Sequence, residues 1–128
     1  MNSYVAMLIV DSKTADLEDP NTILVGRQSE FWGNPFPVGK NWTRSNAIMA
    51  YVKWLATGEV NGKQCFKAKR AKVLENISTL KGKTLACHCA PKRCHAEVLA
   101  LVANEFCTID QLWNRVRKHL ISKTKKGA

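Results

Sequence analysis

Three cysteines and two histidines lie together between Cys87 and His95, where the chain reads Cys-His-Cys-Ala-Pro-Lys-Arg-Cys-His. These residue types can bind metals, act as nucleophiles or transfer protons. The apolar run Thr84–Cys89 follows a glycine, which predicts a short buried strand. Apolar residues recur at helical spacing from Cys94 onwards. The pattern therefore predicts a strand, a tight basic loop and a helix.

Three interpretations of this stretch stay open. In the first, Cys87, Cys89, Cys94 and His95 supply three thiolates and one imidazole to a tetrahedral zinc ion, although their spacing is tighter than in most zinc sites. In the second, the helix start and the basic loop hold a phosphate or another anion beside an activated thiol. In the third, the cysteines are buried packing residues, because free cysteine is among the most buried residue types.

If the site is catalytic, the predicted catalytic residues are Cys94, His95 and Glu97. Cys94, or alternatively Cys89, would be the nucleophile, and His95 or Glu97 the acid/base group. We expect Cys94 and His95 in the first helical turn, where free amides lower thiol pKa values. The chain has no paired carboxylates and no Walker, GxSxG or HExxH pattern. Whether the protein is an enzyme is therefore left open.

The stretch from Gly26 to Gly39 contains three glycines and two prolines, which predict a shaped loop. Its aromatic side chains could stack on a base or cover the core. An arginine just after the predicted strand is placed to bind an anion. An asparagine before proline has a restricted backbone, so its side-chain amide could hydrogen-bond a ligand from a fixed position. The predicted ligand-binding residues are Arg27, Trp32, Gly33, Asn34, Phe36, Arg44, Lys92 and Arg93.

The charge balance favours anionic partners. Twenty Lys and Arg against ten Asp and Glu give a net charge of +10, which is typical of proteins that bind nucleotides or nucleic acid, although a solvated lysine surface gives the same count. Five cysteines without a signal-peptide pattern predict free thiols in a reducing cytoplasm. No apolar run approaches the ~20 residues of a membrane span, so no membrane partner is expected.

These residues must be positioned by an α/β fold. We expect a single small domain over residues 1–122 and a basic flexible tail over residues 123–128. The domain would contain a short mixed β-sheet of three or more strands, with Thr84–Cys89 central, packed by about four helices. The first two predicted strands, Tyr4–Val10 and Thr22–Val25, would pair antiparallel, because their connection looks short for a parallel crossover.

Three further helices are predicted. The first begins at Thr43 or Ser45 and stops at Gly58. The last begins at a capping box that opens with Thr108. Between them, a basic helix spans Cys65–Leu80. Its predicted buried stripe is Phe66, Val73, Leu74, Ile77 and Leu80, and its candidate phosphate contacts are Lys67, Lys69, Arg70 and Lys72.

Three motifs occur in order along the chain: Gly26-Arg27, Trp32-Gly-Asn-Pro-Phe36, and the CxCxPxxCH run that ends at His95. Together they resemble domain of unknown function 4326, a small family of bacteria and their phages, over roughly residues 24–104. The resemblance implies that the GNPF loop and the cysteine turn belong to one unit. It implies no particular activity. His88 takes the place of a frequent aromatic residue in that family, which argues against a catalytic or metal role for it.

Two functions of different classes follow. The leading hypothesis is a nucleotide or nucleic-acid ligand site built from the GNPF loop and the strand–helix turn, with modification of the nucleotide or nucleic acid as its catalytic form. The alternative is a non-catalytic module, zinc-stabilised or not, that holds nucleic acid or a partner protein. Such a module would be a phage-type host-takeover or counter-defence factor in the host cytoplasm.

Overall fold

The computed structural model describes residues 8–27, 29–36, 38–39, 42–90 and 92–127, with side chains described as far as Lys118. It confirms the predicted α/β fold, a small domain in which helices pack on a parallel three-stranded sheet beside a separate two-stranded one. Of the predicted strand Tyr4–Val10, residues 4–7 lie outside the described residues. Strand β1 itself covers Ile9–Asp11.

The main sheet has the order β1-β5-β2, with β2 at Thr22–Leu24 and β5 at Thr84–Cys87. Strand β5 pairs in parallel with both neighbours, which confirms its predicted central place. The expected antiparallel pairing of the first two strands is wrong, because β5 lies between them. Each outer strand has only three residues, roughly 10 Å, and residues 12–21 can reach roughly 33 Å. The connection is therefore long enough for two parallel strands.

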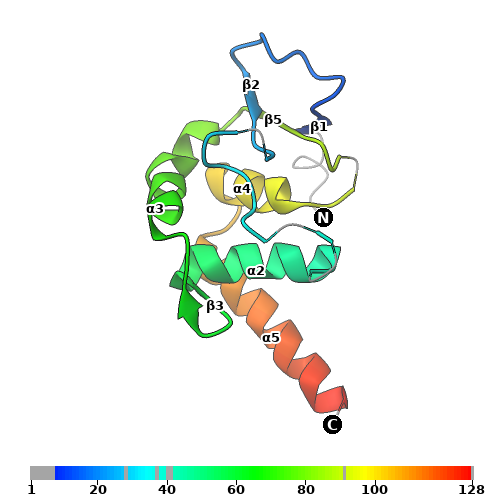
Figure 1. Ribbon diagram of the computed structural model, residues 1–128, viewed down its shortest axis with the longest axis vertical. Helices are drawn as coiled ribbons and strands as arrows, with labels where there is room; N and C mark the ends of the chain where they lie inside the picture. The colour runs from blue at the N-terminus through cyan, green and yellow to red at the C-terminus, as the bar shows by residue number, and fades with distance from the viewer. Residues whose placement is uncertain (1–7, 28, 37, 40–41, 91, 128) are drawn as a thin grey trace.

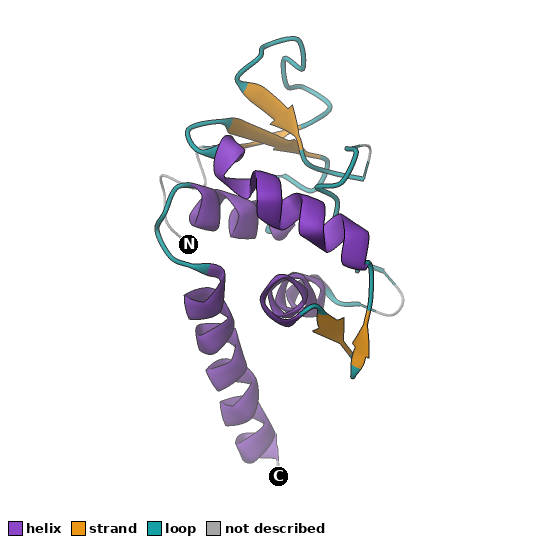
Figure 2. Cartoon of the chain, turned by 90° about the vertical axis from the view of Figure 1, so that its left-hand side faces the viewer, coloured by secondary structure: helices purple, strands orange, loops and turns teal. Residues whose placement is uncertain are grey.

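The helices are stacked on one side of the sheet (Figures 1 and 2). Helix α4, His95–Ala103, packs on β5, and helix α2, Arg44–Thr57, packs on α4. Helix α5, Ile109–Gly127, packs on α2 and extends away from the sheet. The core lies between these layers. Its largest fully buried side chains include Trp54, Tyr51, Leu55, Leu80, Leu85 and Leu99.

The local signals at the ends of α2 and α5 act as predicted. The Thr43 side chain accepts a hydrogen bond from the Asn46 amide, and Gly58 ends α2 in the left-handed conformation at φ 80°. Thr108 and Gln111 form the reciprocal capping box. Helix α5 continues to Gly127, past residue 122 at which the predicted domain ends and into the predicted tail of residues 123–128.

The region between α2 and β5 differs in part from the prediction. A two-stranded antiparallel pair, β3 Glu59–Val60 and β4 Lys63–Gln64, occupies the predicted connection. Helix α3 covers Lys67–Asn76, and the 3₁₀ helix η1 covers Ile77–Leu80. Phe66 and Leu74 are exposed rather than buried, because the helix begins after Phe66 and buries only one narrow side.

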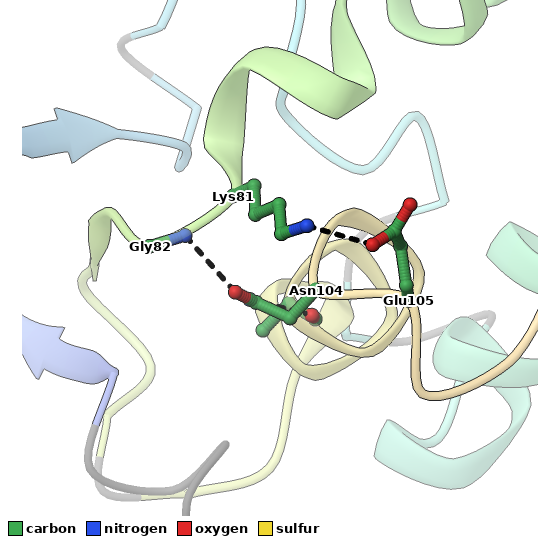
Figure 3. A network of polar contacts seen from close by, with 5 residues as sticks. Lys81, Gly82, Asn104 and Glu105 are labelled. Atoms are coloured by element: carbon green, nitrogen blue, oxygen red, sulfur yellow. Dashed lines mark hydrogen bonds and ion pairs between the residues drawn. The ribbon is translucent and has the colours of Figure 1, made fainter.

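A polar network joins the end of α4 to the loop before β5 (Figure 3). The Asn104 side-chain oxygen accepts a hydrogen bond from the Gly82 amide at 2.9 Å, and its amide nitrogen donates to the Ala100 carbonyl at 2.9 Å. Lys81 Nζ lies 2.7 Å from Glu105 Oε2 in an exposed ion pair. The network fixes where β5 starts relative to the helix that follows it.

Arg70 belongs to the predicted phosphate-binding cluster, but its guanidinium binds the end of α2. Its Nε donates to the carbonyls of Trp54 at 2.9 Å and Leu55 at 3.2 Å, and its Nη2 donates to Leu55 at 2.9 Å. These carbonyls lie in the last helical turn, where a cation is favourable. Arg70 therefore supports the fold.

Replacing Arg70 should test this structural role. We expect Arg70→Met to lower the free energy of unfolding by about 2 kcal/mol, because charge-assisted hydrogen bonds to part-buried carbonyls are lost. The matched control is Lys72→Met on the exposed side of α3, which should leave stability unchanged. Chemical denaturation of both variants measures the difference, and equal stabilities would contradict the assignment.

Candidate functional site

A pocket of about 430 Å³ opens at the carboxyl edge of the three-stranded sheet. All three strands run in the same direction, so their carboxyl ends meet at this edge, which is where open α/β sheets bind ligands. Residues that follow each strand line the pocket, together with the starts of α2 and α4. The lining includes Asp11, Lys13, Arg27, Asn34, Arg44, Ile48, His88, Cys89, Lys92, Cys94 and His95.

Two successive turns after β5 bring the cysteines together. The Ala90 amide donates to the Cys87 carbonyl at 3.3 Å, and the Lys92 amide donates to the Cys89 carbonyl at 2.8 Å. These turns reverse the chain before Cys94. Cys94 itself is the N-cap residue of α4 and has an extended backbone. The three sulfur atoms lie within 4.8 Å of one another. Of the four predicted metal ligands, the three cysteines converge into a cluster that could hold a metal ion.

The thiol electrostatics favour Cys87 over Cys94, the predicted activated thiol, as the more acidic of the two. Cys94 Sγ lies 3.6 Å from Cys87 Sγ and donates its hydrogen to it. In the metal-free chain this hydrogen bond lowers the pKa of the Cys87 thiol to about 5. The same interaction, together with burial, raises the pKa of Cys94 above its ordinary value. Cys87 is the acidic thiol of the pair, but it is fully buried, whereas Cys89 is half-buried and lines the pocket.

His95 is held away from the cysteine cluster. Its Nε2 lies 2.6 Å from the Val25 carbonyl oxygen, so this nitrogen carries the hydrogen and donates. Burial lowers the pKa of His95, which keeps the imidazole neutral. The ring packs edge-on against Tyr51, with centroids 5.2 Å apart. His95 therefore fixes the exit of β2 relative to α4. Its predicted role as a zinc ligand is not supported, because the cluster of possible metal ligands in the described residues contains the three cysteines without His95.

Glu97 and Arg93 lie on the far side of the helix start. Glu97 is 5% exposed, and its carboxylate accepts two hydrogen bonds from Arg93 Nε at 3.1 and 3.2 Å. Neither residue lines the pocket at the sheet edge; both line a smaller hollow between α2, α4 and α5. The predicted acid/base role of Glu97 and ligand role of Arg93 therefore do not fit the geometry. Arg44, which does line the pocket, donates from Nη1 to the Arg93 carbonyl at 2.9 Å.

The GNPF loop is mainly structural. Trp32 and Phe36 are 7% and 6% exposed, belong to the hydrophobic core and do not line the pocket. Neither ring is placed to stack on a base. Gly33 also lies outside the lining, and a Cβ atom there would come within 3.1 Å of the Gly26 carbonyl oxygen. Asn34 reaches the pocket, but its Nδ2 donates to Ala47 and its Oδ1 accepts from the Phe36 amide.

Among the titratable residues of the lining, three were not among the predicted site residues: Asp11, Lys13 and His88. Asp11 ends β1, Lys13 lies just after β1, and His88 follows β5, so a prediction of parallel strands would have found all three. His88 is exposed, and its Nε2 lies 3.7 Å from Cys89 Sγ. The pocket therefore adds one carboxylate, one ammonium group and one imidazole to the predicted set.

Comparison with protein families identifies the family of this chain. The model of the family described as Domain of unknown function (DUF4326) matches residues 10–105. The chain belongs to this family, and both the GNPF loop and the cysteine turn lie within the matched range. No curated protein and no solved structure matches the chain. In the described part of the chain, no helix has both the length and the apolar character needed to cross a bilayer.

Asn34 provides a test of the loop's structural role. We expect Asn34→Ala to lower the free energy of unfolding by about 2 kcal/mol, because the Ala47 carbonyl and the Phe36 amide each lose a partner. Arg27→Ala, at an exposed position in the same loop, should leave stability unchanged. Thermal or urea denaturation compares the two. Equal stability of both variants would contradict the structural role of the Asn34 side chain.

Two glycines of the same loop form a second test. Gly33→Ala should cost about 1–3 kcal/mol, because the added methyl group meets backbone atoms of Gly26 and Arg27 that must shift. Gly39→Ala should be neutral or slightly stabilising, since nothing lies within 4 Å of the added Cβ. A Gly33→Ala protein as stable as the Gly39→Ala protein would contradict the close approach of the two backbone segments.

Proposed function

We propose that this member of the DUF4326 family binds the phosphate of a nucleotide or nucleic-acid end in the pocket at the carboxyl edge of its sheet. The observation that carries the proposal is the charge of the lining. Four cationic side chains surround one cavity, and the described lining holds a single carboxylate, Asp11. The four cations are Lys13, Arg27, Arg44 and Lys92.

Three of these cations are available to a ligand. Within the described residues, the side chains of Lys13, Arg27 and Lys92 form no ion pair or hydrogen bond. Unpaired cations that share one concave site repel one another, so a bound anion would relieve this repulsion. Phosphate suits the site because arginine binds it through two parallel hydrogen bonds and lysine adds a point charge.

The shape of the pocket favours more than a free phosphate. Its volume of about 430 Å³ lies in the range of small-molecule sites. Val38, Ala47 and Ile48 contribute an apolar wall to its lining. A base or sugar could lie against this wall while the phosphate contacts the cations. The proposal is limited to binding, because Glu97 is paired with Arg93 and His95 with a backbone carbonyl.

Calorimetric titration with pyrophosphate, nucleoside monophosphates and short single-stranded oligonucleotides tests the proposal. We expect Arg27→Ala and Lys92→Ala each to weaken binding on the order of ten-fold, because each removes one charge-assisted hydrogen bond. Lys72→Ala removes the same charge from the exposed side of α3 and should leave affinity unchanged.

The salt dependence of the affinity distinguishes a nucleotide bound in the pocket from a polyanion bound along the basic side of α3. A mononucleotide held by a few groups should lose little affinity between low and physiological salt, whereas an oligonucleotide along α3 should lose much more. Absence of binding at millimolar ligand would refute the pocket. The pocket would also be refuted if Lys72→Ala lost as much affinity as Arg27→Ala and Lys92→Ala.

A further inference from the structure

The three clustered cysteines are not explained by phosphate binding. Cys87, Cys89 and Cys94 are free thiols, and their sulfur atoms lie within 4.8 Å of one another at the carboxyl end of β5. A packing role would not require side chains from a strand end, a turn and a helix start to point at one centre. Metal sites have this arrangement, in which sulfur atoms from different parts of the backbone converge on one point.

The distances fit a tetrahedral ion. Two sulfur atoms that each lie about 2.3 Å from zinc are separated by about 3.8 Å. Cys87 Sγ and Cys94 Sγ are 3.6 Å apart, and no pair in the cluster exceeds 4.8 Å. Small side-chain rotations would therefore bring all three sulfur atoms to bonding distance. The two turns that gather the cysteines are fixed by backbone hydrogen bonds, so no rearrangement of the chain is needed.

We propose that Cys87, Cys89 and Cys94 bind one zinc ion, and that its fourth coordination position opens into the pocket at the sheet edge. Cys89 and Cys94 line this pocket. Among the described residues, no histidine or carboxylate joins the three sulfur atoms as a fourth ligand in the cluster. Structural zinc sites have four protein ligands, whereas sites that act on a ligand have three and an open position.

The surroundings suit the charge of such a centre. Three thiolates on one zinc ion carry a net charge of −1, which needs nearby positive charge. The pocket supplies cationic side chains, and the start of α4 adds the partial positive charge of a helix N-terminus. A zinc ion with an open position acts as a Lewis acid or activates a bound water molecule. A ligand held as proposed above would lie beside it; this last step alone rests on the proposed function.

Two nearby histidines are candidates for the fourth zinc ligand, and the structure argues against both. Among the described residues, His95 is not part of the three-sulfur cluster, and its Nε2 is occupied by the Val25 carbonyl. His88 Nε2 lies 3.7 Å from Cys89 Sγ, but His88 is exposed, lines the pocket and is not part of the three-sulfur cluster. The variant His88→Ala therefore distinguishes an open site from a closed one.

Elemental analysis of untagged protein, purified under reducing conditions with zinc in the growth medium, tests the metal. We expect one zinc per chain. Cys89→Ser should lose it, and the matched control Cys65→Ser, a half-buried cysteine outside the cluster, should keep it. Titration of the metal-free wild-type protein with Co²⁺ tests the site without any substitution. The absorption spectrum should show intense thiolate-to-cobalt bands and the d–d bands of a tetrahedral ion, both saturating at one equivalent.

The open position is tested on the same cobalt protein. Added imidazole should shift the d–d bands, and His88→Ala should keep one metal per chain with an unchanged thiolate band. Lack of zinc, zinc retained in Cys89→Ser, or a Cys87–Cys94 disulfide in the reduced preparation would overturn the metal site. Loss of metal in His88→Ala, or no response to imidazole, would overturn the open position. Metal content is measured without any phosphate ligand, so this result is independent of the proposed phosphate binding.

Discussion

The site depends on the parallel hydrogen bonding of β5 to strands on both of its sides. The Val25 amide donates to the Ala86 carbonyl at 2.9 Å, and the Ser12 amide donates to the Cys87 carbonyl at 3.3 Å, so pairing continues to the very end of each strand. This register sets three chain segments side by side at one edge. The cations, the cysteines and the pocket share that edge because the strands that carry them end together.

Side chains of the helices and of the GNPF loop hold this edge of the sheet in place. The buried imidazole of His95 ties the exit of β2 to α4, and Tyr51 packs against the same ring while its hydroxyl donates to the Trp32 carbonyl. The GNPF loop thus covers the core with its aromatic rings and supports the pocket with its backbone. Such fixed surroundings keep the exposed cations and the clustered thiols in a defined arrangement, as a binding site requires.

Local features of the sequence could be predicted well, because the residues that determine them are close together in the chain. Thr43, Gly58 and the capping box at Thr108 act through hydrogen bonds within a few residues. Pairing of β5 between β1 and β2 could not be predicted in this way, since it joins Ile9 to Leu85 and Thr22 to Thr84, which are far apart in the chain. The roles of Arg70 and His95 were missed for the same reason, because their partners lie on other elements. The cysteines were predicted as a possible metal site from their residue type and close spacing, and they meet because the chain turns after Cys87.

The most direct test of the account is a two-dimensional ¹H–¹⁵N NMR titration of the reduced protein with a nucleoside monophosphate. The account predicts saturable shifts for the amides of Arg27, His88 and Lys92 at the sheet edge, and none for Lys67 and Lys72 on the basic face of α3. Shifts confined to α3, or none at all at millimolar ligand, would contradict the claim that the carboxyl edge of this sheet is the ligand site.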